Sequence, residues 1–150
     1  MLTAAVLLLG STAAAAQTSV LTINVSGNPS TVVINTAAPG SNPTGVTDAS
    51  TTYTITVTFR GAMAGKHAKI TAQLNQNMPA GTTLTATLAS PAGGTSLGPV
   101  NLSTVPQTLV NGIASANAQT QGITYTLSAT PAAGVVSPAS RTVTFTVVAY

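Results

Sequence analysis

The sequence predicts an all-β protein folded as a β-sandwich, and three observations support this fold class. Apolar residues alternate with threonines over several short stretches, which is the two-residue period of a strand. Glycine, proline and asparagine separate these stretches at short intervals, as turns between strands do. No stretch combines a helical period with helix caps. The segment 112–121 is rich enough in alanine that a helix is an alternative there.

The clearest predicted strands have one apolar face and one hydroxyl-bearing face. Tyr53, Ile55, Val57 and Phe59 alternate with threonines, and comparable alternation marks three later strands. We expect these later strands at 83–88, 123–130 and 142–147, and further strands at 20–25, 31–36, 68–74, 97–102 and 107–113. Short strands with such spacing are typical of an immunoglobulin-like sandwich, with a barrel as the alternative.

The N-terminus has the pattern of a cleaved export signal covering residues 1–16. A short apolar run, Leu2 to Leu9, leads to alanines at 14 and 16, which fit the small-x-small rule for cleavage before Gln17. The run is shorter than the about 20 apolar residues that span a bilayer. We therefore expect a secreted protein whose mature chain has no transmembrane segment.

Composition divides the mature chain into three parts. Residues 17–36 form an N-terminal extension that holds a candidate donor strand and a first strand. Residues 37–50, with Pro39 and Gly40 among their turn formers, are expected to form a loop or linker. Residues 51–150 form the body of the predicted sandwich.

The side chains that most enzymes use are nearly absent. Charged residues make up 3% of the chain, against about 25% in typical proteins. The only acidic residue is Asp48, which excludes the paired carboxylates of glycosidases and aspartic proteases. With one histidine, His67, and no cysteine, the chain also lacks the ligands of a typical metal site. We expect no catalytic residues, no cofactor and no metal.

Three of the four lysines and arginines lie in one segment. Arg60, Lys66 and Lys69 lie close together in the sequence with His67. Such a loop suits contact with an acidic glycan, a surface polymer or DNA, but blocks this short are more often solvated hairpins. The density of basic and aromatic residues is too low to indicate nucleic-acid binding. We expect a basic surface loop.

Low charge and the pattern at the two ends of the mature chain favour assembly. Few surface charges leave little to oppose association between copies. Near the start, Leu21, Ile23 and Val25 share an apolar face, as expected of a strand donated to another sheet. The closing strand offers an apolar face for an acceptor groove, formed by Val143, Phe145 and Val147. The sequence leaves open whether the first strand pairs in its own chain or in a neighbour.

These features resemble the pilus subunits of the chaperone-usher pathway, in the archaic and spore-coat-U-like branch. The likeness rests on the Ala-rich leader, the alternating segment 21–25, and the terminal strand 141–150 with its aromatic end. It implies an incomplete immunoglobulin-like fold that is completed by a donated strand from an identical subunit. It also implies a periplasmic chaperone, an outer-membrane usher and a cell-surface filament. A secreted binding or adhesion module is the alternative function.

Overall fold

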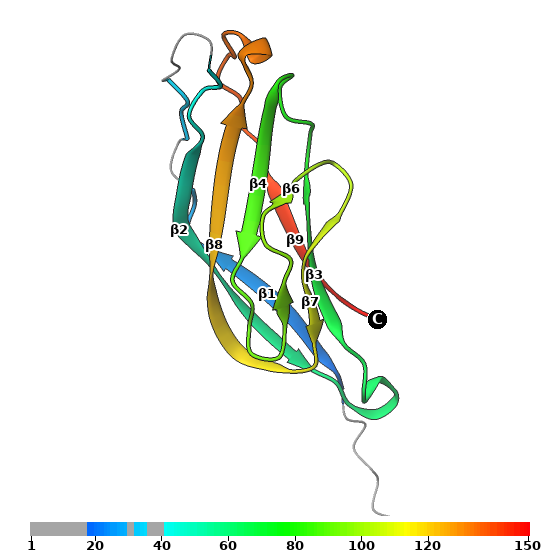
Figure 1. Ribbon diagram of the computed structural model, residues 1–150. Helices are drawn as coiled ribbons and strands as arrows, with labels where there is room; N and C mark the ends of the chain where they lie inside the picture. The colour runs from blue at the N-terminus through cyan, green and yellow to red at the C-terminus, as the bar shows by residue number, and fades with distance from the viewer. Residues whose placement is uncertain (1–17, 30–31, 36–40) are drawn as a thin grey trace, which may run out of the picture.

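The protein forms two antiparallel sheets packed as a β-sandwich (Figure 1). The computed structural model describes residues 18–29, 32–35 and 41–150. The predicted export signal lies outside these residues. The strands are β1 (Val20–Ser26), β2 (Val46–Thr58), β3 (Ala68–Leu74), β4 (Thr82–Leu88), β5 (Thr95–Ser96), β6 (Val100–Asn101), β7 (Gln107–Ile113), β8 (Ala116–Ala129) and β9 (Val143–Ala149).

One sheet has five strands in the order β1-β2-β8-β4-β6, and the other has four in the order β5-β7-β3-β9. Two short 3₁₀ turns, Gly61–Met63 and Pro131–Ala133, are the helical elements of the described residues. The long strands β2 and β8 pair along most of their length and form the centre of the larger sheet. This arrangement confirms the predicted all-β sandwich, and the separate sheets exclude the barrel alternative.

The core lies between the sheets, where the alternating apolar residues meet. On β2 the inward side chains of Tyr53, Ile55 and Val57 are at most 1% exposed, while the intervening threonines face outward. Further core side chains come from β3 and β8, Ile70 and Ile123 among them. The outward threonines interact across strands, as the hydroxyls of Thr54 and Thr120 do at 2.8 Å.

In this chain β1 pairs within its own sandwich, which is one of the two arrangements that the sequence leaves open. β1 pairs with β2 from Val20 opposite Thr58 to Ser26 opposite Thr52, so it is part of the larger sheet. β2 begins at Val46, inside the segment 37–50 that was expected to be a loop. Its first residues alternate weakly but continue the pairing with β8, so tertiary context extends the strand beyond its sequence signal.

Two expected strands are wrong in part. Residues 32–35 of the predicted strand 31–36 form no strand, and Val32, Val33 and Ile34 line a hollow. The predicted strand 97–102 is reduced to β6, and the nearby β5 belongs to the other sheet. Gly98, with φ of 74°, and Pro99 let the chain cross between the sheets at this point.

The alanine-rich segment 112–121 is extended, not helical. It holds the end of β7 and the start of β8, which are joined by a short connection. Ala118 has a φ of 47°, and its amide donates a hydrogen bond to the Thr56 hydroxyl at 3.2 Å. Pairing with β2 on one side therefore overrides the helical propensity of the alanines.

Candidate assembly site

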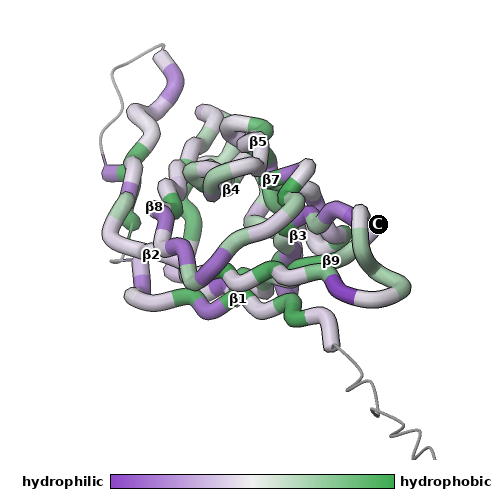
Figure 2. Tube along the Cα trace, turned by 90° about the horizontal axis from the view of Figure 1, so that it is seen from below, coloured by the Kyte–Doolittle hydropathy of each residue, from purple (hydrophilic) through white to green (hydrophobic). Residues whose placement is uncertain are grey.

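One side of the sandwich is bordered by two edge strands from different sheets. β1 ends the five-stranded sheet and β9 ends the four-stranded sheet, and the two lie next to each other (Figure 2). Within the described residues, β1 pairs only with β2, and β9 pairs only with β3. We call this side, formed by β1 and β9, the open side, because each strand has one edge to which no other described strand pairs.

The inward side chains on the open side are incompletely covered. On β9, Val143, Phe145 and Val147 pack against the core but are only half-buried. On β1, Leu21 and Ile23 are half-buried in the same way, and Val25 is 43% exposed. The inward positions of β3 and of the second half of β2 are fully buried. The core is therefore covered better along these central strands than between β1 and β9.

A cavity of about 250 Å³ marks one end of the open side. Val25 of β1 lines it together with Val143 and Phe145 of β9, and Thr51 and Tyr125 form its inner wall. The Thr51 hydroxyl is buried and has no hydrogen-bond partner within the described part of the chain. The cavity thus combines apolar side chains of β1 and β9 with the polar Asn28 and Arg141 and with the unsatisfied hydroxyl of Thr51.

The phenol of Tyr125 adds a neutral hydroxyl to this wall. Burial, and to a lesser extent the nearby carboxylate of Asp48, raise the pKa of Tyr125 to about 12, so the ring stays uncharged at neutral pH. Asp48 itself accepts hydrogen bonds from the amide and the hydroxyl of Ser50, at 3.1 Å and 2.7 Å. This is an Asx contact, and it occurs in an irregular part of β2.

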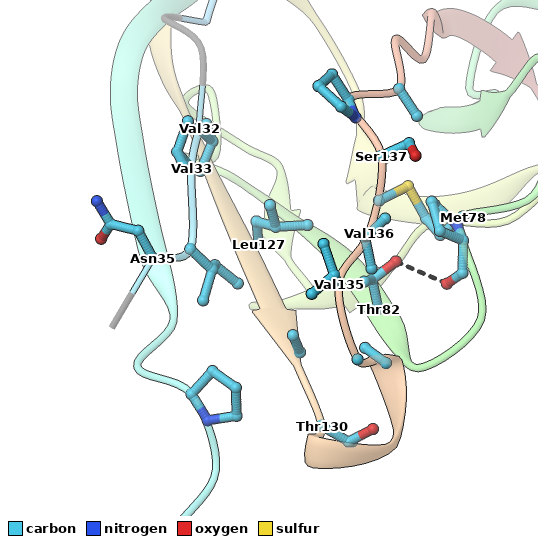
Figure 3. Close-up of a pocket in the computed structure, with 18 of the residues that line it drawn as sticks. Val32, Val33, Asn35, Met78, Thr82, Leu127, Thr130, Val135, Val136 and Ser137 are labelled. Carbon is cyan, nitrogen blue, oxygen red and sulfur yellow. Dashed lines mark hydrogen bonds between the residues drawn. The ribbon is translucent and has the colours of Figure 1, made fainter. Parts of the chain in front are cut away.

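A larger hollow of about 790 Å³ lies beyond β8, where loops close the end of the sandwich (Figure 3). Val32 and Val33 line one side of it, Val135 and Val136 line the other, and Leu127 lies between them. The Thr82 hydroxyl at its margin donates a hydrogen bond to the Pro79 carbonyl at 2.7 Å. The hollow is mostly apolar, and none of the sequence predictions placed a site there.

The predicted basic loop lies at the opposite end, between β2 and β3. Arg60, Lys66 and His67 are exposed, and Lys69 is half-buried. Tyr150 joins this group because its backbone exchanges hydrogen bonds with His67 and its ring centre lies 5.8 Å from the Lys69 ammonium. The Tyr150 hydroxyl donates a hydrogen bond to the Asn111 side chain at 2.6 Å, which fixes the ring beside the lysine.

The structure brings together the acceptor residues predicted on β9 and the donor residues predicted on β1, but within one chain. Leu21, Ile23 and Val25 hold a place beside β2 of their own chain, so donation to a neighbour requires β1 to leave that place. Sequence reasoning missed Thr51 and Tyr125 as cavity residues. Tyr125 continues the alternation of its strand like the other inward residues, whereas Thr51 stands among hydroxyl side chains, between Ser50 and Thr52, where no alternation marks it as inward.

The described residues offer no cluster for metal or triad chemistry. Asp48 near the start of β2 and His67 beyond its end are separated by the length of the strand, and the described part of the chain holds no group of three metal-ligating side chains. It also contains no helix long and apolar enough to span a membrane. No protein-family model, curated protein or solved structure matches this chain, so the functional argument rests on the geometry of the open side.

Proposed function

We propose that the protein is a structural subunit of an extracellular filament whose identical subunits join by exchanging an N-terminal strand. The observation that carries this proposal is that β1 is an edge strand, which pairs with β2 alone among the described strands and packs half-buried apolar side chains beside β9. Unpaired strand edges next to apolar surface are the template for strand addition. The fold is then an incomplete immunoglobulin-like sandwich that a neighbour's strand completes.

The candidate donor is residues 17–26 of the adjacent subunit. In the isolated chain, β1 already lies beside both β2 and β9, so a neighbour's copy of this strand can take the same place and pack in the same way. Such an exchange of identical elements costs little free energy, because the pairing that β1 gives up in its own chain forms again in the next chain.

The chain between β1 and β2 is long enough to allow this exchange. Residues 27–45 can span about 60 Å when extended, which exceeds the length of the sandwich strands. A head-to-tail exchange that does not close on itself produces a filament. The low content of charged residues, 3% of the chain, leaves little repulsion between subunits.

A monomer with β1 in its own sheet competes with the filament. A strand tethered to its own domain has an effective concentration in the millimolar range, which favours the closed monomer in dilute solution. Assembly then needs either a subunit concentration above this range or a partner that keeps β1 out of its own sheet, which is the role of a periplasmic chaperone and an outer-membrane usher in the resembled family. An export signal at residues 1–16 is consistent with assembly at the cell surface.

The hollow of about 790 Å³ supports a second candidate, a secreted binding or adhesion module. Val32, Val33, Val135 and Val136 give it an apolar lining that suits a hydrophobic ligand. Among the described residues, its walls are mostly loops with few convergent polar groups and no aromatic side chain, which makes this candidate weaker than assembly.

A lysine at Ile23 tests the proposal against a lysine at the neighbouring position 22. Ile23→Lys places a charge in the apolar interface, which costs several kcal/mol, whereas Thr22 faces solvent on the same strand. We expect filaments of the wild-type protein and of Thr22→Lys in electron micrographs and sedimentation, and none of Ile23→Lys.

A synthetic peptide of residues 17–26 separates donation from folding defects. Added during assembly, the wild-type peptide should shorten filaments by occupying open sites, and the same peptide with lysine at position 23 should have no effect. A wild-type protein that stays monomeric at high concentration and ignores the peptide would contradict strand exchange and favour the binding module.

A further inference from the structure

The end of the sandwich that carries the basic loop has a second distinctive property: the N-terminal segment meets the fold there. The Ser19 hydroxyl accepts a hydrogen bond from the Arg60 amide at 2.9 Å and donates one to the Arg60 carbonyl at 3.3 Å. Ser19 therefore lies at the same end as Arg60. In the sequence, the chain that precedes Ser19 contains the apolar run Leu2 to Leu9.

Positive charge is concentrated at this end. Three of the four lysines and arginines of the sequence lie here, at positions 60, 66 and 69. The one acidic side chain, Asp48, is near the other end of β2, roughly 30 Å away at the rise of an extended strand. That separation exceeds the screening length of about 8 Å at physiological salt, so the carboxylate does little to reduce the potential around the loop.

The tip of the basic loop is apolar. Exposed Ala62 and Ala64 flank the half-buried Met63, and Arg60 and Lys66 border this tip on either side. An apolar tip bordered by cations suits the boundary between anionic headgroups and acyl chains. Acidic side chains at the same two positions would be repelled by such headgroups.

We propose that this end, formed by Arg60, Ala62–Ala64, Lys66 and Lys69, is a surface that docks on anionic phospholipid headgroups. While the apolar run preceding β1 is still attached, the docking surface and that run act on the same membrane. Two such weak signals together are what stable membrane attachment requires. The proposal concerns a different end of the molecule from the large hollow and does not depend on filament assembly.

Vesicle co-sedimentation of the chain from Gln17 onward tests the docking surface without the apolar run. We expect binding to vesicles containing phosphatidylglycerol, weak binding to pure phosphatidylcholine, and loss of binding in high salt. Removing one cation near an anionic surface reduces partitioning about fivefold. Lys66→Gln should therefore bind about fivefold more weakly than the wild type.

Arg141→Gln is the matched control, since it removes the same charge at the other end of β9, where Arg141 donates hydrogen bonds to the Asn77 and Ser140 carbonyls. Its partitioning should stay within about twofold of the wild type, because it lies far from the docking surface. Equal losses in Lys66→Gln and Arg141→Gln would overturn the proposal, as would equal binding to neutral vesicles. Binding to dextran sulfate without binding to anionic vesicles would also overturn it and identify an anionic polymer as the partner.

Discussion

Thr51, on the open side, carries a buried hydroxyl that lowers the stability of the fold. Its side chain is 1% exposed, and its hydroxyl has no hydrogen-bond partner among the described residues. It lies where the pairing of β2 with β8 shifts register after Asp48. A buried hydroxyl without a partner costs the free energy of its lost hydration.

Replacing Thr51 by valine should therefore stabilise the isolated protein. Valine has nearly the same shape and lacks the hydroxyl, so we expect the free energy of unfolding to rise by about 1 kcal/mol. Thr54→Val is the control, because Thr54 shares a 2.8 Å hydroxyl contact with Thr120, and its loss should lower stability by about 0.5 kcal/mol. Urea denaturation measures both. A clear destabilisation of Thr51→Val would mean that the hydroxyl is satisfied, for instance by water in the cavity.

At the residue scale, the sequence predicts which side chains of a strand point inward, but it does not predict how deeply they are buried. Alternation correctly assigns Val143, Phe145 and Val147 to the inward face of β9. It cannot predict that they are only half-buried, because coverage depends on which strand from another part of the chain lies beside them. Thr51 escapes notice for a related reason, since its unsatisfied hydroxyl lies at a register shift that no local pattern contains.

At the scale of elements, two glycine turns show how the ends of the sandwich are held. Gly81 and Gly93 have similar positive φ angles of 74° and 78°. A Cβ built at Gly81 would lie 2.7 Å from the backbone of Ala133, in the 3₁₀ turn that leads into the loop lining the large hollow. A Cβ at Gly93 would meet nothing within 4 Å. The two glycines therefore share a positive φ but differ in what surrounds them.

Alanine at these two positions separates backbone strain from steric conflict. Each substitution places an L-residue in the left-handed region, at a cost of about 1 kcal/mol. Gly81→Ala also forces the 131–133 turn away, and overpacking of this kind adds about 2 kcal/mol. We expect thermal unfolding to show a small loss of stability for Gly93→Ala and a loss about three times larger for Gly81→Ala. Equal losses of stability in the two variants would mean that the 131–133 turn shifts to make room for the new Cβ with no loss of free energy.

Strands with strong alternation could be predicted, and crossings between sheets could not. β4 and β9, in which threonines alternate with apolar residues, begin and end within two residues of the predicted bounds 83–88 and 142–147. The segment 97–102 has the composition of a single strand, yet only β6 forms within it, and β5 just before it joins the other sheet. Long-range pairing determines which sheet each short strand joins, because β5 pairs with β7 and β6 pairs with β4. No local sequence pattern contains this information.

For the whole molecule, we propose that β1 serves a neighbouring subunit as well as its own chain. The structure of the single chain gives the register that either arrangement would use, with Asn24 opposite Thr54. The chain has no cysteine, so introduced cysteines can report which chain supplies the strand. A disulfide between facing strand positions is geometrically feasible.

Disulfide trapping in Asn24→Cys/Thr54→Cys distinguishes strand exchange between subunits from pairing within one chain. The control is Thr87→Cys/Thr124→Cys, a register pair of β4 and β8 that both arrangements keep within one chain. After assembly and oxidation, strand exchange predicts a covalent ladder for the first variant on a non-reducing gel and only monomers for the control. Cross-linked monomers alone in both variants, under conditions where filaments are visible, would contradict the exchange of β1 between subunits.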